Sequence, residues 1–414
     1  MAQNDEAISG ASKVQVSGLD NARGAEGAPC TPAGEQQSNA ASPSTTGNRT
    51  GSDQAAKKEE KNEKRGAIVA APLPISSPAI GTGIIPFAGY IFHIDKTDKI
   101  TPPSVVGGVG LITNNGSRAL ALGGELYLKR GDYYVTSIYL RGHLNYNFYG
   151  IGSAAGDAGL KLAITQTGNV FLGEGLRRIG WKFYLGPRAW TAHSEIAQDL
   201  SKSDTNHPNI PAIYLNTDVK AWGVRLLRDT RPNHFYPIGG TFFDFTSNFF
   251  YVSPSAQAGS GTTGSSNSLQ RNNFTFQAYR LTFNKYASLS ERQVLAYNIY
   301  LCAVNGEAPF YGQCLFGTNN ELRGYVAGRY IDLRMFATQL EYRLELPKRF
   351  GLAAFGGVGE VAPTVAKFRY DELLPAVGAG LRYMLSKKYH VNLRVDIAQG
   401  KNGHTWSMGV AEAF

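Results

Sequence analysis

The residues with the clearest potential for chemistry lie between positions 321 and 332, where the chain reads ELRGYVAGRYID. Arg323 precedes Gly324, and glycine permits backbone angles that other residues avoid, so the pair predicts a cation at the tip of a sharp turn. A cation in that position needs a carboxylate or water as its partner. A solvated arginine on a surface loop explains Arg323 equally well when it is taken alone, because charged residues are usually exposed.

Carboxylates are available on the strand that is predicted directly after this turn. Between 335 and 346 the odd positions include Gln339, Glu341, Arg343 and Glu345, whereas most even positions are apolar. A period of two places successive side chains on opposite faces of a strand. The pattern therefore predicts a strand with one apolar face and one charged face, and the charged face is a candidate partner for the turn.

Similar alternation continues through most of the chain from Gly83 to Phe414. Segments of about ten alternating residues, separated by turns rich in Gly, Asn, Asp or Lys, are typical of a transmembrane barrel. In the last such segment, apolar and polar residues alternate up to Phe414, as in the sorting signal of outer-membrane barrels. We predict sixteen strands, which begin near residues 83, 104, 117, 132, 158, 169, 181, 213, 238, 271, 289, 329, 351, 374, 389 and 404.

A soluble β-sandwich or propeller also contains alternating strands and buries aromatic residues. The predicted strands run to ten or more residues, whereas strands of soluble proteins usually have about five or six. Many of them carry small or charged residues on the second face, and aromatic residues at strand ends, such as Tyr133, Phe148 and Tyr251, suit interfacial girdles. These observations favour an all-β fold: a sixteen-stranded antiparallel transmembrane β-barrel.

The composition divides the chain near Gly66. No Phe, Trp or Tyr occurs before that point, so this part cannot bury enough apolar surface to offset its chain entropy. All 22 Tyr, 21 Phe and 4 Trp follow it. We expect residues 1–66 to form a disordered polar arm and residues 67–414 to form the barrel.

Charge and hydropathy exclude other classes of protein. The formal net charge is +9, but the cations are dispersed and do not form the stripe of a nucleic-acid binder. No run approaches the roughly 18 apolar residues of a membrane-spanning helix. Polar residues follow Met1, so no signal peptide is visible; either the protein stays inside the cell or a signal was removed. The barrel favours the second alternative and the bacterial outer membrane, with its lipids as partners.

Several motifs resemble the BamA/TamA-like surface-antigen barrels, which include two-partner secretion transporters. The resemblance covers roughly residues 73–414. The chain is most similar to the short members of this family, which lack periplasmic substrate-binding repeats. Such a repeat needs about 75 residues of mixed strand and helix, and no such pattern precedes Leu73. The resemblance implies that a long loop with the Arg-Gly-Tyr turn folds back into the lumen. It rests on LRGYVAGRYIDLRMFATQLEYR, RDTRPNHFYPIGG, FGGVGEVA, VGAGLRY and NLRVDIAQG.

The resemblance also assigns roles to residues of the turn and its surroundings. The lumen motif is Leu322, Arg323, Gly324 and Tyr325, and the first acidic partner of Arg323 is Glu341. Guanidinium geometry suits such a charge-assisted pair and allows one or two hydrogen bonds to the carboxylate. The family's second acid is missing, because that position holds Gly357, and the nearby Glu360 has the opposite parity. We expect one of three other residues to complete the network: Arg343, Glu345 or Asp396.

The function that the resemblance implies is insertion or translocation of polypeptide, or of lipid, at the outer membrane. It implies a weakly paired seam between the first and last strands, to which we assign Pro86, Ala88, Met408 and Phe414; proline lacks a ladder donor and belongs on strand edges. The cargo would be unfolded polypeptide or lipid, and a periplasmic partner stays unidentified. The alternative is a passive pore or structural barrel that is plugged by its own loop.

Cysteines and candidate enzyme motifs add one covalent prediction. Cys302 and Cys314 flank AVNGEAPFYGQ in the same long loop, and an oxidising envelope would favour a disulfide between them. The GAGLRY segment at 378–383 lacks the third glycine and the helix of a dinucleotide loop, and the histidines lack metal-ligand spacing. We expect no enzyme activity, no cofactor and no metal.

Overall fold

The computed structural model describes residues 66–95, 101, 103–198, 213–258, 268–269, 272–318, 321–387 and 390–414. The arm expected at 1–66 lies outside the described residues, apart from Gly66, which begins the first strand. The other described residues therefore belong to the part of the chain that was predicted to form the barrel.

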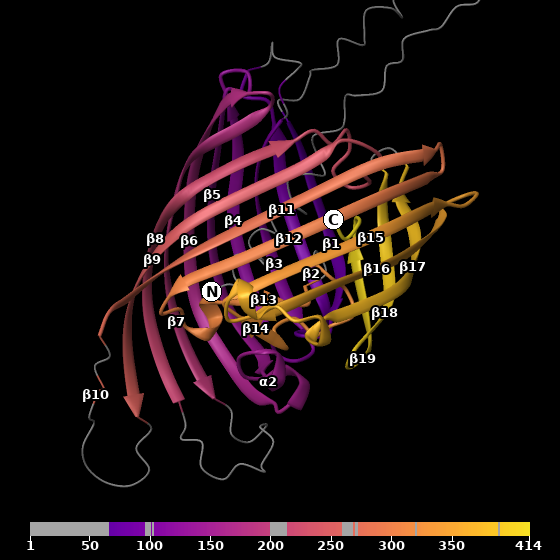
Figure 1. The fold of residues 1–414 in the computed structure, drawn as a ribbon. Coiled ribbons are helices and arrows are strands. Elements are labelled where there is room, and N and C mark those ends of the chain that lie inside the picture. Colours follow the sequence, from indigo (N-terminus) through magenta and orange to yellow (C-terminus); the bar gives the residue numbers. More distant parts are fainter. Residues whose placement is uncertain are drawn as a thin grey trace, which may run out of the picture.

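The described residues form a closed antiparallel barrel of sixteen long strands, as predicted (Figure 1). Each strand pairs with the next long strand along the chain, and β1 closes the wall by pairing with β19. The strands are β1 (Gly66–Ser77), β2 (Gly81–Phe92), β3 (Ser104–Thr113), β4 (Arg118–Leu128), β5 (Tyr133–Phe148), β6 (Leu162–Gly180), β7 (Phe183–Gln198), β8 (Ile213–Asp229), β9 (Thr241–Ala258), β11 (Phe274–Ser290), β12 (Gln293–Gly306), β15 (Arg334–Glu345), β16 (Phe350–Ala362), β17 (Leu374–Ser386), β18 (Val391–Gly400) and β19 (Gly403–Val410).

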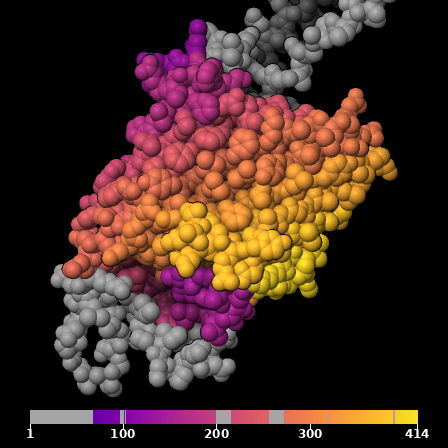
Figure 2. Space-filling model, in the orientation of Figure 1, coloured from indigo at the N-terminus to yellow at the C-terminus, as the bar shows by residue number. Residues whose placement is uncertain are grey.

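The two faces of the wall differ in the way that separates a membrane barrel from a soluble sandwich. Leu340 is 46% exposed, whereas its neighbours Gln339 and Glu341 are fully buried. The same inversion occurs at β18, where Ile397 is 58% exposed beside the buried Asp396. Apolar side chains thus face outward and polar ones inward, as lipid outside and a polar interior require. The outer wall in Figure 2 is a continuous surface from the orange strands to the yellow ones.

The number of strands is as predicted, but two assignments were wrong and offset each other. A strand, β1, precedes the one expected near residue 83, and its prolines Pro72 and Pro74 had obscured it. The strands expected near 158 and 169 are one strand of 19 residues, β6, in which Gly168 does not interrupt the pairing.

The connections differ in length between the two ends of the barrel. One end, called here the long-loop end, carries the connections β5–β6, β7–β8, β9–β11, β12–β15 and β16–β17. The other, the short-turn end, carries tight turns such as β4–β5 and β6–β7 together with the longer β2–β3 and β8–β9 connections. Outer-membrane barrels place short turns on the periplasmic side.

Short elements lie in the connections. They are α2 (Ser153–Ala158), β10 (Ser268–Leu269), β13 (Cys314–Phe316), β14 (Tyr330–Asp332) and the 3-10 turns Phe310–Gly312, Val365–Lys367 and Tyr370–Glu372. β13 and β14 pair with each other in a separate two-stranded sheet. Within the described ranges, no helix has the length and apolar character needed to cross a membrane.

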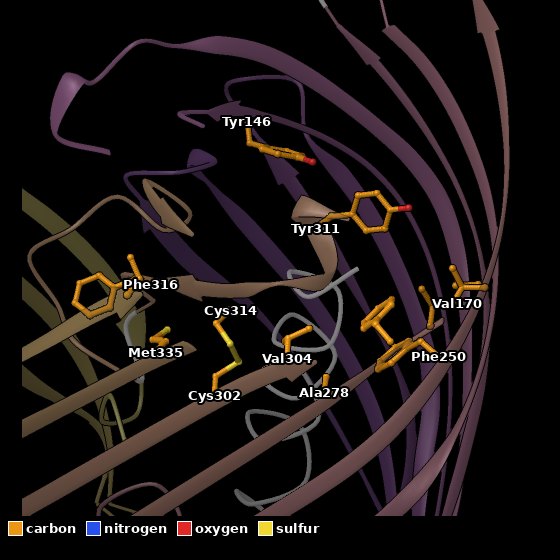
Figure 3. Packing of buried hydrophobic residues seen from close by; sticks show 14 of the residues in the cluster. Tyr146, Val170, Phe250, Ala278, Cys302, Val304, Tyr311, Cys314, Phe316 and Met335 are labelled. Atoms are coloured by element: carbon orange, nitrogen blue, oxygen red, sulfur yellow. A yellow bond between two sulfur atoms is a disulfide. The ribbon is translucent and has the colours of Figure 1, made fainter. Parts of the chain in front are cut away.

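The β12–β15 connection packs its apolar residues against the buried face of the wall. Tyr311 and Phe316 of this connection belong to the same buried cluster as Val304, Met335 and Phe250 of the strands (Figure 3). Phe316 is completely buried and stands edge-on to the ring of Tyr325, 5.2 Å away between centroids. The connection is thus anchored by side-chain packing at several points.

Candidate functional site

The Arg-Gly-Tyr turn is buried among strands from the second half of the barrel. Leu322, Arg323 and Tyr325 are at most 3% exposed. Gly324 has a φ of 114°, and a Cβ there would lie 3.0 Å from the Cβ of Ala376. Glycine is therefore required both by the left-handed backbone and by the close approach of the wall.

The guanidinium of Arg323 divides its donors among three side chains. Nε donates to Oε1 of Gln339 at 3.1 Å, Nη1 to Oδ2 of Asp396 at 2.8 Å, and Nη2 to Oε2 of Glu341. Its centre lies 3.5 Å from the centroid of the Phe355 ring. The expected contact with Glu341 is present through one hydrogen bond, because the other terminal nitrogen of the guanidinium binds Asp396.

Asp396 takes the place of the acid that Gly357 cannot supply. A Cβ on residue 357 would lie 2.1 Å from the carbonyl oxygen of Thr338 and 2.6 Å from Cδ1 of Leu322. A side chain at that position would therefore collide with the turn itself. The carboxylate comes instead from β18, two strands further along the wall.

Three more arginines extend the contacts of Arg323 into a network. Arg343 donates to Glu341 at 2.5 Å, and Arg394 donates to Asp396 at 2.9 Å. Arg382 reaches Asp396 at 2.6 Å and Glu412 at 2.8 Å. Among the described residues, the network thus contains four guanidinium groups and three carboxylates, each with a side chain at most 9% exposed. Removing one partner from such a buried set leaves an uncompensated charge, which is costly.

Two residues considered for the network lie outside it. Glu345 contacts His390 at 3.0 Å, because it is the last residue of β15 and sits beside the β17–β18 turn. Glu360 accepts the backbone N–H of Arg369 at 2.8 Å, on the side of the wall away from Arg323. Sequence reasoning missed Arg382, Arg394 and Glu412, although the parity of Asp396 on β18 would have pointed to Arg394.

Tyr325 fixes the other side of the turn. Its hydroxyl donates to the carbonyl oxygen of Pro375 at 2.7 Å and accepts the N–H of Lys401 at 3.2 Å. Burial raises the pKa of Tyr325 to about 12, so the hydroxyl stays a neutral donor at any physiological pH. The turn is therefore tied to β17 and to the β18–β19 turn as well as to the charge network.

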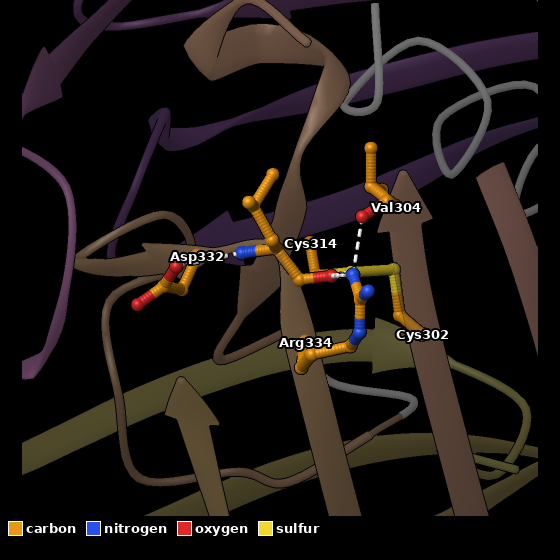
Figure 4. The surroundings of a disulfide bond; sticks show 6 residues. Cys302, Val304, Cys314, Asp332 and Arg334 are labelled. Carbon is orange, nitrogen blue, oxygen red and sulfur yellow. Dashed lines mark hydrogen bonds between the residues drawn. A yellow bond between two sulfur atoms is a disulfide. The ribbon is translucent and has the colours of Figure 1, made fainter. Parts of the chain in front are cut away.

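A disulfide joins the start of this connection to β12. Cys302 and Cys314 are bonded, with their Cα atoms 5.8 Å apart (Figure 4). Beside the bond, Nη1 of Arg334 donates to the carbonyl oxygens of Val304 and Leu333. The bond holds β13 next to the strand from which the connection departs.

The seam lies between β1 and β19, so the seam prediction was wrong for two residues. Pro86 and Ala88 are on β2, where they pair with Pro72 and Ala70 of β1. Met408 does lie on the seam, opposite Ser76. Among the described residues this is one register pair, whereas β1 and β2 share twelve.

Phe414 also departs from the predicted seam, because the chain leaves the wall before reaching it. β19 ends at Val410, and Ala411 has a left-handed φ of 68°. Phe414 is 8% exposed, packs with Tyr286 in a buried cluster, and accepts a hydrogen bond from Nη2 of Arg343 at 3.1 Å. Continuing the Ser76–Met408 register would place Pro74 opposite Val410 and Pro72 opposite Glu412. Prolines cannot donate to a ladder, which fits the departure of the tail at this point.

The described residues contain no group of three or more His, Cys, Asp or Glu side chains that could hold a metal ion. The site pairs protein cations with protein carboxylates, and each of its three carboxylates contacts at least two guanidinium groups. Arg323 belongs to the turn and its two carboxylates belong to β15 and β18, so these ion pairs join the turn to the wall.

No protein-family model matches the chain, and no curated protein matches it in sequence. Its structure resembles two solved barrels. BamA from Haemophilus ducreyi lacking POTRA domains 1–3 aligns with a TM-score of 0.52 and 12% identity, over 84% of this chain and 70% of that one. CdiB from Acinetobacter baumannii aligns with a TM-score of 0.50 and 11% identity, over 84% of this chain and 60% of that one. The chain therefore has the sixteen-stranded outer-membrane barrel fold of BamA and CdiB.

Proposed function

We propose that this protein resides in the bacterial outer membrane and inserts or translocates polypeptide there, with the β12–β15 connection inside its lumen. The fold of BamA and CdiB supports the class of protein. The observation that carries the proposal is the β1–β19 seam, for which the described residues give a single register pair beside a tail that turns inward. We expect outer-membrane lipids as surroundings, unfolded polypeptide or lipid as cargo, and no nucleic acid.

The seam would act through the unpaired backbone N–H and C=O groups at the edge of β1. The residues of β1 that precede Pro74 have no strand partner on the β19 side among the described residues. Ile68, one of these residues, is 80% exposed. An unpaired strand edge offers N–H and C=O groups that an incoming strand can use. Within hydrocarbon these groups are costly to leave unmet, so the edge favours capture of a strand or local thinning of the bilayer.

The buried network couples this seam to the Arg-Gly-Tyr turn. Arg382 contacts both Asp396, which binds Arg323, and Glu412, which lies in the tail that leaves β19. Arg343 similarly contacts both Glu341 and the carbonyl oxygen of Phe414. A shift of the turn would therefore change the partners of the tail. We expect the turn to hold the tail inward when the protein is at rest.

Photocrosslinking from the free edge of β1 tests the proposal in cells. A photoreactive residue at Ile68 should trap unfolded outer-membrane or secreted polypeptides, identified by mass spectrometry. The same residue at Phe171, which is 48% exposed on β6 far from the seam in the strand order, serves as the matched control. Equal products from the two positions, or lipid adducts alone at Ile68, would contradict polypeptide handling at the seam.

A passive pore is the second candidate, because the buried face of the wall carries a further charged group of residues. Arg225 donates to Glu174 at 2.5 Å and, with two donors at 2.9 Å each, to Asp244. Polar interiors of this kind line water-filled channels in other barrels. A large and steady single-channel conductance in planar bilayers would favour the pore, and brief, rare openings would favour the seam.

A further inference from the structure

The two tight turns β4–β5 and β6–β7 at the short-turn end lie together and carry a concentration of cations. We propose that they form a binding site for the headgroups of anionic phospholipids. These turns form the purple and magenta tip at the upper end of the molecule (Figures 1 and 2). The residues of this basic patch are Lys129, Arg130, Arg177, Arg178, Trp181, Lys182 and Arg228.

The charge of the patch is unbalanced. Residues 129–132 and 177–182 contain five cations and one carboxylate, Asp132. That carboxylate is already bonded to Arg178 at 2.5 Å. Arg130, Arg177 and Lys182 are exposed and have no side-chain hydrogen bond or ion pair to any other described residue. An excess of unmatched cations on a surface calls for an anionic partner.

Hydrogen bonds hold the turns in a fixed arrangement. The hydroxyl of Tyr184 donates to the carbonyl oxygen of Gly131 at 2.8 Å. The backbone N–H of Arg178 donates to the backbone carbonyl oxygen of Asp132, also at 2.8 Å. Nε of Arg228 donates to the carbonyl oxygen of Trp181 at 3.1 Å. The cations are thus presented by a preformed surface that spans β4 to β8.

Positive φ angles at large residues in both turns indicate that these side chains serve a contact outside the turn. Lys129 and Arg130 have φ values of 50° and 58°, and Trp181 and Lys182 have values of 47° and 65°. Tight hairpin turns with positive φ at both central positions favour Asn-Gly or Gly-Gly. Bulky residues in this conformation are strained, and such strain is a reason to look for function.

The position of the patch on the wall selects lipid as the partner. Arg177 lies opposite Tyr133 on β5 and opposite Leu185 on β7, and Leu185 is 42% exposed on the outward apolar face. Trp181, in the turn that joins β6 to β7, is 89% exposed. Aromatic residues and cations at the rim of an apolar band are typical of the headgroup region. Phosphate oxygens of anionic lipids would match the guanidinium groups there.

This inference rests on the membrane-spanning part of the proposed function and is independent of transport. Full-length protein is reconstituted in phosphatidylcholine bilayers mixed with phosphatidylglycerol, with bromine on the acyl chains of one lipid at a time. Quenching of tryptophan fluorescence then reports which lipid lies beside the protein. The share of the signal that is lost in Trp181→Phe belongs to the patch.

We expect brominated phosphatidylglycerol to quench the Trp181 share with a preference of at least about fivefold over phosphatidylcholine, the effect of one engaged cation near an anionic surface. The triple variant Arg130→Gln, Arg177→Gln and Lys182→Gln should lose the preference. A control with equal charge removal at the long-loop end, Arg118→Gln, Lys161→Gln and Lys367→Gln, should keep it. Both variants are first checked for the folded barrel by their electrophoretic mobility before and after heating.

Three outcomes would overturn the site. Equal quenching by the two lipids in the wild-type protein would remove the selectivity. A preference that persists in the triple variant would place it elsewhere on the wall. Loss of the preference on adding inorganic phosphate at the ionic strength of a chloride control would assign the patch to free phosphate instead of lipid.

Discussion

At the scale of single residues, substitution of Arg323 is the most direct test of the charge network. Its side chain is 1% exposed and contacts two carboxylates and one amide. Arg323→Met should lower the free energy of unfolding by about 3–5 kcal/mol, since the buried carboxylates of Glu341 and Asp396 each lose a charged hydrogen-bond donor. Glu341→Gln should cost less, because Asp396 still binds the guanidinium. Unfolding by urea in lipid vesicles, followed by tryptophan fluorescence, measures both.

The double variant separates the pair from the rest of the network. Because Arg323 and Glu341 are in direct contact, their effects should be non-additive, with a coupling between about 0.5 and 3 kcal/mol. Additive losses would mean that Glu341 stabilises the wall through Arg343 and Arg382 instead.

Gly324 gives a second prediction at this scale. Gly324→Ala combines a left-handed φ with a Cβ contact of 3.0 Å to Ala376, so it should destabilise the protein by about 1–3 kcal/mol. Gly175→Ala on β6 is the matched control, because a Cβ there would meet nothing within 4 Å. Its effect on the same unfolding measurement should stay within about 0.5 kcal/mol. Equal effects at the two positions would mean that the Gly324 turn is not packed against β17.

The sequence identified the contact between Arg323 and Glu341 but only part of its surroundings. Motif order pointed to the turn, and alternation put Glu341 on the polar face. Which side chains accept hydrogen bonds from the guanidinium depends on which strands lie opposite the turn. The spacing of residues along the chain does not reveal those strands. Asp396 was one of three candidates for this reason, and Glu412 was missed because it follows the end of a strand.

At the scale of elements, the β12–β15 connection depends on its disulfide. Cys302 and Cys314 are separated by 12 residues, and closing a loop of this size is worth on the order of 3 kcal/mol in a chain-entropy account. The double variant Cys302→Ser and Cys314→Ser should therefore lose part of that stability and become cleavable within 303–313 by added protease. Cys30→Ser is the control, since Cys30 takes no part in this disulfide and lies outside the described residues. Protease resistance equal to that of the wild type would mean that packing alone holds the connection.

Alternation located most strands to within a few residues, but it failed where chemistry interrupts the pattern. Pro72 and Pro74 concealed β1, and a Gly at 168 divided β6 into two in the prediction. Both errors concern residues whose backbone properties are read as breaks. In a closed wall, neighbouring strands on both sides hold such residues in place, and a single sequence does not reveal those neighbours.

At the scale of the whole molecule, the fold predicts membrane-like behaviour. With apolar side chains on the outer face and charge inside, residues 67–414 should require detergent and should migrate differently on electrophoresis before and after heating. Recovery of monomeric, β-rich protein without detergent would contradict the outward-facing apolar wall.

The central claim is that the β1–β19 seam opens during activity, and a reversible lock across it is the most direct test. Cysteines at Ser76 and Met408, which are paired in register, would close the seam on oxidation. Cysteines at Ser76 and Thr82 would instead join β1 to β2, which share twelve register pairs, and this control experiences the same oxidation and reduction of Cys302–Cys314. The outer-membrane and secreted proteins of cells carrying each form are then compared by quantitative mass spectrometry. The account predicts that only the seam lock depletes these proteins and that reduction restores them; unchanged levels in the locked form would contradict it and favour a passive barrel.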